Sequence, residues 1–301
     1  MKHKHHIIPK HMGGSDNPEN LIELTIEEHT DSSINNELKE LADELYKDKI
    51  DGFVGSISDI TYTIKINHNM PKYYSSVPTK EILDSIISNR PLNIILEVDA
   101  PVLYDTDYII SIIIHEVRHI YDIYTITKKK HFNSFVRELK IQTARKNIND
   151  ERFSKFLNCV YYSLLHELVA RNNQVYPIIK NKKLNKEDCY DMIKNTYIYS
   201  TLDYLSSFDS NQFINGFSRE EISKFTNEFN NLYCSVDKKI ESIEEYYKKW
   251  EIFFKKTKDR WYDEMKLEID KIYETTGSNH QIVENECSLL LTWIVDNFII
   301  K

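Results

Sequence analysis

The chain has 301 residues and a formal net charge of −8. It is therefore long enough to bury a large core, and it lacks the overall positive charge by which many proteins hold nucleic acid. Its longest apolar runs are far shorter than the roughly 20 residues that cross a bilayer, so no membrane contact is expected.

Only six glycines and seven prolines occur, which favours helices with short connections over a turn-rich all-β fold. The N-terminal stretch is polar and basic and has no apolar segment of the kind found in secretory signals, which predicts a cytoplasmic location or a place inside a virion. The four cysteines lie far apart without a CxxC spacing, so we expect free thiols rather than metal ligands or disulfides.

The first 33 residues predict a short strand, a Gly-Gly loop, a second strand over NLIEL and then a helix. Thr25 can cap that helix because Glu28 follows three residues later, where a capping box needs a carboxylate. The stretch INNELKELADELYKDKI continues as an amphipathic helix, with Leu38, Leu41 and Leu45 at helical spacing.

Residues 53 to about 105 predict a small sheet, because ITYTIKIN alternates with a period of two and LNIILEV is again strand-like. A helix is expected between them, near TKEILDSIIS. Further along, three long helices are predicted over residues 107–128, 151–176 and 236–274. The last alternates Glu and Lys, as is typical of a solvated amphipathic helix or helical hairpin.

Several histidines gather near the N-terminus, in the stretch KHKHHIIPKHMGGSDNPENLIELTIEEHT. The elements HHIIP, GG, NL and a helical EEH follow one another at fixed spacing, and this order resembles the HNH nuclease family, most closely its small phage and homing-type members. The resemblance covers about residues 3 to 45. It implies a ββα-metal module that binds a divalent ion (Mg²⁺, Mn²⁺, Ni²⁺ or Zn²⁺) and cleaves DNA.

The HNH resemblance implies roles for four residues of this stretch. His5 on the first strand and His29 on the helix would be metal ligands. His6 would be the general base that activates water against a phosphodiester, since a neutral imidazole takes up a proton near pH 7. Asn20 would hold the loop and orient that base.

Two features of the same stretch differ from the residue pattern of active HNH nucleases. Ser33 stands where close relatives often carry another histidine, which leaves the metal shell a ligand short. Acidic residues outnumber lysines there, which opposes phosphate binding. A degenerate HNH remnant or a structural zinc knuckle is therefore the alternative interpretation.

A second metal motif lies in the helix predicted over 107–128. Residues 115–119 read HEVRH, the HExxH pattern in which two histidines on one helical face bind a Zn²⁺ ion and the glutamate holds the attacking water. The pattern alone recurs by chance, but its helical context favours a cleft-lining metal helix: Glu116 borders the polar stripe, and apolar residues cover the opposite side. The polar stripe contains Ser111, His115, His119 and Asp122.

A zinc site of this type needs a third ligand from elsewhere in the chain. Glu167 falls at the edge of the apolar stripe of the helix predicted over 151–176, where a carboxylate is costly unless it is paired or bound to metal. His166 points away from that stripe. Two alternatives stay open: Glu167 forms an i,i+4 ion pair with Arg171, or Asp122 is the third ligand or an acceptor for one of the histidines.

With Glu167 as the third ligand, the arrangement resembles the gluzincin branch of the zincin metallopeptidases over residues 53 to about 180. The resemblance implies that His115, His119 and Glu167 hold Zn²⁺ and that Glu116 is general base and acid. It also implies a sheet beside the metal helix, with a peptide or protein substrate adding to the edge strand.

The sequence thus predicts an α+β fold in three parts: an HNH-like ββα-metal module over 1–50, a mainly helical zincin-like domain with a small sheet over 53–185, and a C-terminal helical region over 186–301. The preferred function is a metal-dependent hydrolase, a zinc metallopeptidase fused to a nuclease-like module that has DNA as its partner. One alternative is an HNH endonuclease with a non-catalytic helical scaffold. Another is a phage virion-associated structural protein braced by metal. The expected location is a host-cell cytoplasm or a phage virion.

Overall fold

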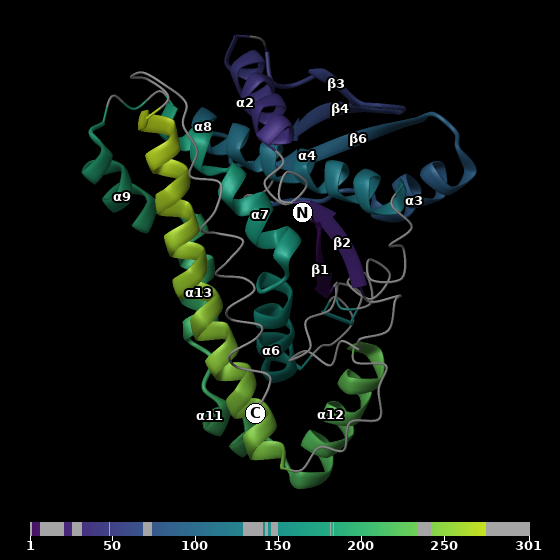
Figure 1. Ribbon diagram of the computed structural model, residues 1–301, viewed down its shortest axis with the longest axis vertical. Helices are drawn as coiled ribbons and strands as arrows, with labels where there is room; N and C mark the ends of the chain where they lie inside the picture. The colour runs from purple at the N-terminus through teal and green to yellow at the C-terminus, as the bar shows by residue number, and fades with distance from the viewer. Residues whose placement is uncertain are drawn as a thin grey trace.

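The structure, a computed structural model, describes residues 2–6, 21–25, 32–47, 49–68, 74–128, 141, 144–145, 150–180, 182, 184–233 and 242–274. Within these ranges the fold is α+β, as the sequence predicts. A small sheet lies towards one end of the molecule, and helices make up most of the rest (Figure 1). No helix of the described ranges is long and apolar enough to cross a membrane.

The main sheet has four strands, in the spatial order β3-β4-β6-β5. These strands are β3 (Val54–Ile57), β4 (Ile60–Asn67), β6 (Leu92–Asp99) and β5 (Tyr74–Ser75). β4 and β6 run parallel, and the connection between them contains α3 (Thr79–Ser88), which confirms the two strands and the helix predicted there. The edge strands β3 and β5 pair antiparallel to their neighbours. They were not predicted, because segments of four and two residues are too short to show a period.

The alternation in β4 and β6 places every second side chain on a buried face. These buried residues are Ile60, Tyr62, Ile64, Ile66, Ile94, Leu96 and Val98. Gly55 on β3 pairs with Tyr62 on β4, and a Cβ at this glycine would overlap the Tyr62 ring. The sheet therefore needs a residue without a side chain at position 55 so that the Tyr62 ring can lie across it.

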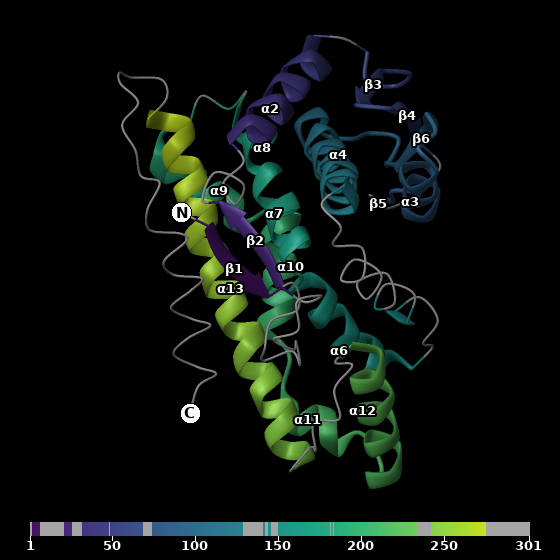
Figure 2. The same ribbon diagram turned by 45° about the vertical axis from the view of Figure 1, so that its right-hand side comes forward.

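Helix α4 (Thr106–Lys128) confirms the helix predicted over 107–128. In Figure 2 the sheet and α3 lie on one side of α4, and α7 (Leu165–Asn173) and α8 (Val175–Lys180) lie on the other. Its apolar residues are buried because the helix is covered on both sides. They include Ile109, Ile110, Ile113, Ile114, Val117 and Ile120.

The single long helix predicted over 151–176 is wrong, because the chain forms α6 (Glu151–Tyr162), α7 and the start of α8 over this segment. The break lies at Ser163 and Leu164. The Ser163 hydroxyl donates to the Cys159 carbonyl at 2.7 Å, and Leu164 has an extended backbone with ψ of 140°. A serine that bonds back to its own helix competes with the helical hydrogen bonds, and the extended residue then redirects the chain.

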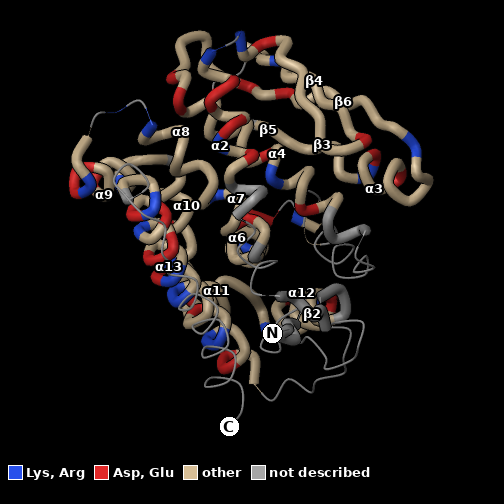
Figure 3. The backbone as a smooth tube through the Cα atoms, turned by 45° about the horizontal axis from the view of Figure 1, so that its top comes forward, with Lys and Arg blue, Asp and Glu red and all other residues tan. Residues whose placement is uncertain are grey.

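The described residues of the C-terminal half are mainly helical, as predicted. They are organised around one long helix, α13 (Ile243–Glu274), which runs along much of the molecule (Figure 1). The helices that precede it are α9 (Lys186–Lys194), α10 (Tyr197–Ser206), α11 (Ser210–Asn215) and α12 (Arg219–Tyr233). α13 carries lysines, arginines and acidic residues interspersed along its length (Figure 3), while Tyr247, Phe254 and Trp261 are buried. It is therefore the amphipathic helix that its charge pattern predicts.

The described residues form two apolar cores. The first contains buried residues from Leu38 to Ile123, and the second contains buried residues from Ile141 to Ile269. α2 (Ser32–Lys47), which falls within the predicted 1–50 module, buries Leu38, Ala42 and Leu45 in the first core. The predicted boundary at residue 185 lies inside the segment that forms the second core.

Candidate metal centre

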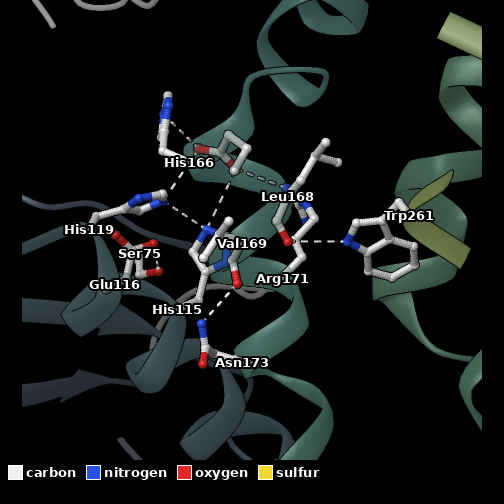
Figure 4. A network of polar contacts seen from close by, with 11 residues as sticks. Ser75, His115, Glu116, His119, His166, Leu168, Val169, Arg171, Asn173 and Trp261 are labelled. Carbon is white, nitrogen blue, oxygen red and sulfur yellow. Dashed lines mark hydrogen bonds and ion pairs between the residues drawn. The ribbon is translucent and has the colours of Figure 1, made fainter. Parts of the chain in front are cut away.

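His115 and His119 lie one turn apart on α4 and face the same way (Figure 4). Their Nε2 atoms are 3.0 Å apart. The apolar back of α4 fixes this orientation, because burying its isoleucines against the sheet and α3 turns the two imidazoles towards α7. His115 is 9 % exposed, and the His119 side chain is 13 % exposed.

Glu167 brings a carboxylate to the two histidines from the first turn of α7. Its Oε2 atom lies 3.6 Å from His115 Nε2, and its Oε1 atom lies 3.3 Å from His119 Nε2. One ligand atom from each of the three residues can be chosen so that all lie within 4.8 Å of one another. Residues 48 positions apart in the chain are thus brought to one point between the two cores.

The three donors fit a zinc ion in both chemistry and spacing. A tetrahedral Zn²⁺ with bonds near 2.0–2.1 Å keeps neighbouring donors about 3.3 Å apart. The two Nε2 atoms lie 3.0 Å apart, and each lies close to one of the two Glu167 oxygens, His115 at 3.6 Å from Oε2 and His119 at 3.3 Å from Oε1. Glu167 Oε1 is buried and receives no hydrogen bond of ordinary geometry from the described residues. A cation among the three side chains would satisfy that oxygen.

The electrostatics favour the metal-binding protonation states of His115 and Glu167. Burial, and then the charge of His119, hold the pKa of His115 well below its usual range, so its imidazole is neutral. Burial alone would raise the pKa of the Glu167 carboxyl, but the charges of His119 and Arg171 outweigh it and hold this pKa well below the usual range. Neutral imidazoles and an ionised carboxylate are the forms in which these side chains coordinate a divalent ion.

Contacts of α7 with its neighbours fix the position of Glu167. Arg171 Nη2 donates to Glu167 Oε2 at 3.3 Å, so the i,i+4 pair considered above is present together with the approach to the histidines. The Trp261 indole on α13 donates to the Leu168 carbonyl at 3.2 Å (Figure 4). This buried bond holds the first turn of α7 against the longest helix of the second core.

Glu116 lies beside the three donors without being one of them. Its Oε1 atom accepts a hydrogen bond of 2.6 Å from the Ser75 hydroxyl on β5 (Figure 4). Burial raises the pKa of the Glu116 carboxyl, as is common for carboxylates that exchange protons during catalysis. Ser75 could not be found from the sequence, since it belongs to a two-residue strand that has no pattern.

Asp122 does not join the donor group formed by the described residues. Its Oδ1 atom accepts a hydrogen bond of 2.9 Å from Arg118 Nε, an i,i+4 pair on α4. Of the two residues considered as a third ligand, Glu167 therefore lies with the histidines and Asp122 does not.

Two further aromatic side chains reach the centre that sequence reasoning did not place there. The His166 ring centroid is 5.3 Å from that of His119, and its Nε2 atom is 3.8 Å from Glu167 Oε1. Burial, followed by the charge of Glu167, raises the pKa of Tyr161 well above its usual range. The predicted continuous helix turned His166 away, and the break at Leu164 turns it towards the site.

The residues assigned to the HNH module cannot be placed as a site. His5 and His6 lie on β1 (Lys2–His6), which pairs antiparallel with β2 (Leu21–Thr25), but their side chains fall outside what the structure describes. Asn20 and His29 lie outside the described residues. The strand pairing agrees with the expected order of elements, and the nuclease site stays a prediction.

Comparisons with known proteins find no matching family, no matching curated protein and no matching solved structure. The resemblances to HNH nucleases and gluzincins therefore rest on the motifs alone. Function has to be argued from the geometry and chemistry of the site.

Proposed function

We propose that the chain is a zinc-dependent hydrolase that cleaves peptide bonds at the centre formed by α4 and α7. The observation that carries this proposal is the convergence of His115, His119 and Glu167 within 4.8 Å. Two histidines and a glutamate are a donor set that catalytic zinc uses, because three protein ligands leave a fourth position for water or substrate.

In this proposal zinc supplies a Lewis acid that polarises a carbonyl and lowers the pKa of water. The protein's own groups do the rest. Glu116 takes a proton from water, and its raised pKa keeps it ready to return that proton to the leaving amine. The Ser75 hydroxyl orients the Glu116 carboxyl through the 2.6 Å hydrogen bond.

The sheet beside the metal helix offers a place for a peptide. β5 is an edge strand, paired on one side with β6, and its Ser75 contacts Glu116. An extended peptide that paired with the open side of β5 would pass close to Glu116, as in other proteins that bind peptides by strand addition.

A metal that only braced the fold is the main competing function, and Glu116 argues against it. Structural zinc sites are closed by four protein ligands, whereas the donor group of the described residues contains three. A buried carboxylate next to such a group, hydrogen-bonded to a serine rather than paired with a cation in the described part of the chain, is costly to keep. A role in catalysis would explain why this carboxylate is buried there.

The HNH nuclease is a second candidate function and would act at a separate centre. The antiparallel pairing of β1 with β2 supports it. Plasmid nicking in the presence of Mg²⁺, Mn²⁺, Ni²⁺ or Zn²⁺ tests it, and His6→Ala should abolish the nicking. Nicking that survives this substitution would show that His6 is not the general base.

The peptidase proposal is tested by zinc content and by peptide cleavage in matched variants. The wild-type protein should bind zinc at this centre, and the His115→Ala, His119→Ala double variant should bind one equivalent less. His68→Ala changes an exposed histidine stacked on Tyr104 and should bind as much zinc as wild type. Mass spectrometry of a proteome-derived peptide library then reports cleavage.

Glu116→Gln should keep zinc but lose cleavage, because the base is removed and the ligands remain. Glu97→Gln is its matched control, since the Glu97 side chain is 66 % exposed on the sheet and should leave cleavage unchanged. A wild-type protein without zinc, or a Glu116→Gln variant that still cleaves, would contradict the proposal.

A further inference from the structure

Arg145 lies close to the metal centre and has no carboxylate partner in the described part of the chain. Its guanidinium carbon is 3.8 Å from the centroid of the Tyr161 ring and 6.0 Å from that of Tyr162. Its Nη1 atom is buried without a hydrogen-bond partner among the described residues. The aromatic contact holds the guanidinium in place and leaves the Nη1 donor free for an acceptor.

This arrangement differs from that of four other arginines in the described part of the chain. Arg118, Arg152, Arg171 and Arg260 each form an ion pair with an aspartate or glutamate, namely Asp122, Asp150, Glu167 and Glu264. A guanidinium carries five N–H donors in a planar fork that matches a carboxylate. A buried donor left unsatisfied costs free energy, so a group placed like Arg145 is suited to receive an anion from outside the chain.

The position of Arg145 links it to the site on α4 and α7. Tyr161, on which it stacks, lies 6.3 Å from His166 between ring centroids, and His166 lies 5.3 Å from His119. Two rings therefore separate the guanidinium from the nearest metal-ligating histidine. An extended peptide spans such an interval with roughly two to four residues at about 3.3–3.6 Å each.

The neighbouring carboxylates do not occupy Arg145. Glu167 is paired with Arg171, and Glu116 accepts its hydrogen bond from Ser75. A carboxylate matches the planar fork of the guanidinium, which can donate two parallel hydrogen bonds to its two oxygens.

We propose that Arg145 binds a carboxylate of the peptide substrate, either an acidic side chain or a free C-terminal carboxylate, within a few residues of the cleaved bond. This inference rests on the proposed peptidase function and adds its substrate class. Arg145 selects substrates by binding this carboxylate and takes no part in the bond cleavage itself.

The test uses the full-length zinc-loaded protein and the best-cleaved peptide from the library. That peptide is resynthesised with each acidic residue as glutamate or glutamine, and with a free or an amidated C-terminus. The wild-type protein should lose at least about tenfold in kcat/KM when the bound carboxylate is removed, the size expected for a charge-assisted hydrogen bond. The two arms show whether a side chain or the terminus supplies it.

Arg145→Gln should reduce this preference to less than about twofold while its activity on the neutral peptide stays near that of wild type. Arg145→Lys, which keeps the charge without the planar fork, should retain part of the preference, and it serves if the glutamine variant fails to fold. Arg152→Gln is the control, since Arg152 pairs with Asp150 away from the site and should leave the preference intact.

Binding separates this inference from the cleavage chemistry. Zinc-loaded Glu116→Gln protein is incubated with the library, and the recovered peptides are identified with and without the Arg145→Gln change. Enrichment of carboxylate-bearing peptides that depends on Arg145 supports the inference. If wild type nevertheless cleaves no peptide, the proposed function fails and the binding inference stands. An equal preference in wild type and Arg145→Gln, or no recovered peptides, overturns it.

Discussion

Zinc added to the metal-free protein should raise its melting temperature by several degrees. A ligand that binds only the folded chain stabilises it by about 4 kcal/mol when present at about 1,000 times its Kd. The site joins α4 of the first core to α7 of the second, so both cores should share this stabilisation. With unfolding entropies of about 2.1 cal/mol/K per residue over 301 residues, the expected shift is about 6 °C.

Differential scanning calorimetry of chelator-treated protein with and without zinc measures this shift. The His115→Ala, His119→Ala variant should show no shift, because it keeps only one donor of the three. His68→Ala should shift as wild type does. The reasoning is refuted if wild type does not respond to zinc, or if the double variant responds equally.

Three further predictions concern the scaffold. Burial would raise the pKa of Glu251, but hydrogen bonds from Lys255, Ser210 and Lys248 lower it to about 2. The ionised carboxylate therefore stabilises the fold above its ordinary pKa of 4.5, and this stabilisation is lost as the pH falls towards 2. Wild type should therefore lose at most about 3 kcal/mol more than Glu251→Gln over this range in acid unfolding. Trp261→Phe should cost about 1–3 kcal/mol in urea unfolding and weaken zinc binding, because it leaves the buried Leu168 carbonyl without its donor; unchanged zinc affinity would show that α7 is held by other contacts. Gly55→Ala should cost about 1–3 kcal/mol through overlap with the Tyr62 ring, and an equally stable variant would contradict that packing.

The metal helix could be predicted because its signal is local. Two histidines four residues apart share a helical face, and the apolar residues between them define which face is buried. The same reasoning predicted the strands over ITYTIKIN and LNIILEV and the helix between them, and the structure contains all three. Each of these elements carries its period over at least seven consecutive residues.

The remaining parts of the site depend on tertiary contacts that the periodicity of the sequence does not reveal. Glu167 was identified from its position beside an apolar stripe, but the break at Leu164 changed the orientation of His166. Ser75 lies on a strand of two residues and meets Glu116 only through the pairing of β5 with β6. The stacking of Arg145 on Tyr161 likewise brings together side chains from separate helical segments.

The end of the N-terminal module stays a prediction, because it depends on packing as well as on sequence order. An amphipathic helix shows that it has an apolar face but does not show which core receives it. α2 follows the histidine-rich stretch in the chain, yet its Leu38, Ala42 and Leu45 are buried with the sheet and α4. Tertiary packing, rather than sequence order, decides which domain such a helix joins.

The most direct test of the metal centre is a crystal structure of zinc-loaded protein with anomalous diffraction recorded on both sides of the zinc absorption edge. We predict a strong anomalous peak about 2.0–2.2 Å from His115 Nε2, His119 Nε2 and a carboxylate oxygen of Glu167. Glu116 should lie beside the ion without binding it. Zinc-loaded protein without a peak between α4 and α7, or with the ion held by other residues, would contradict the account.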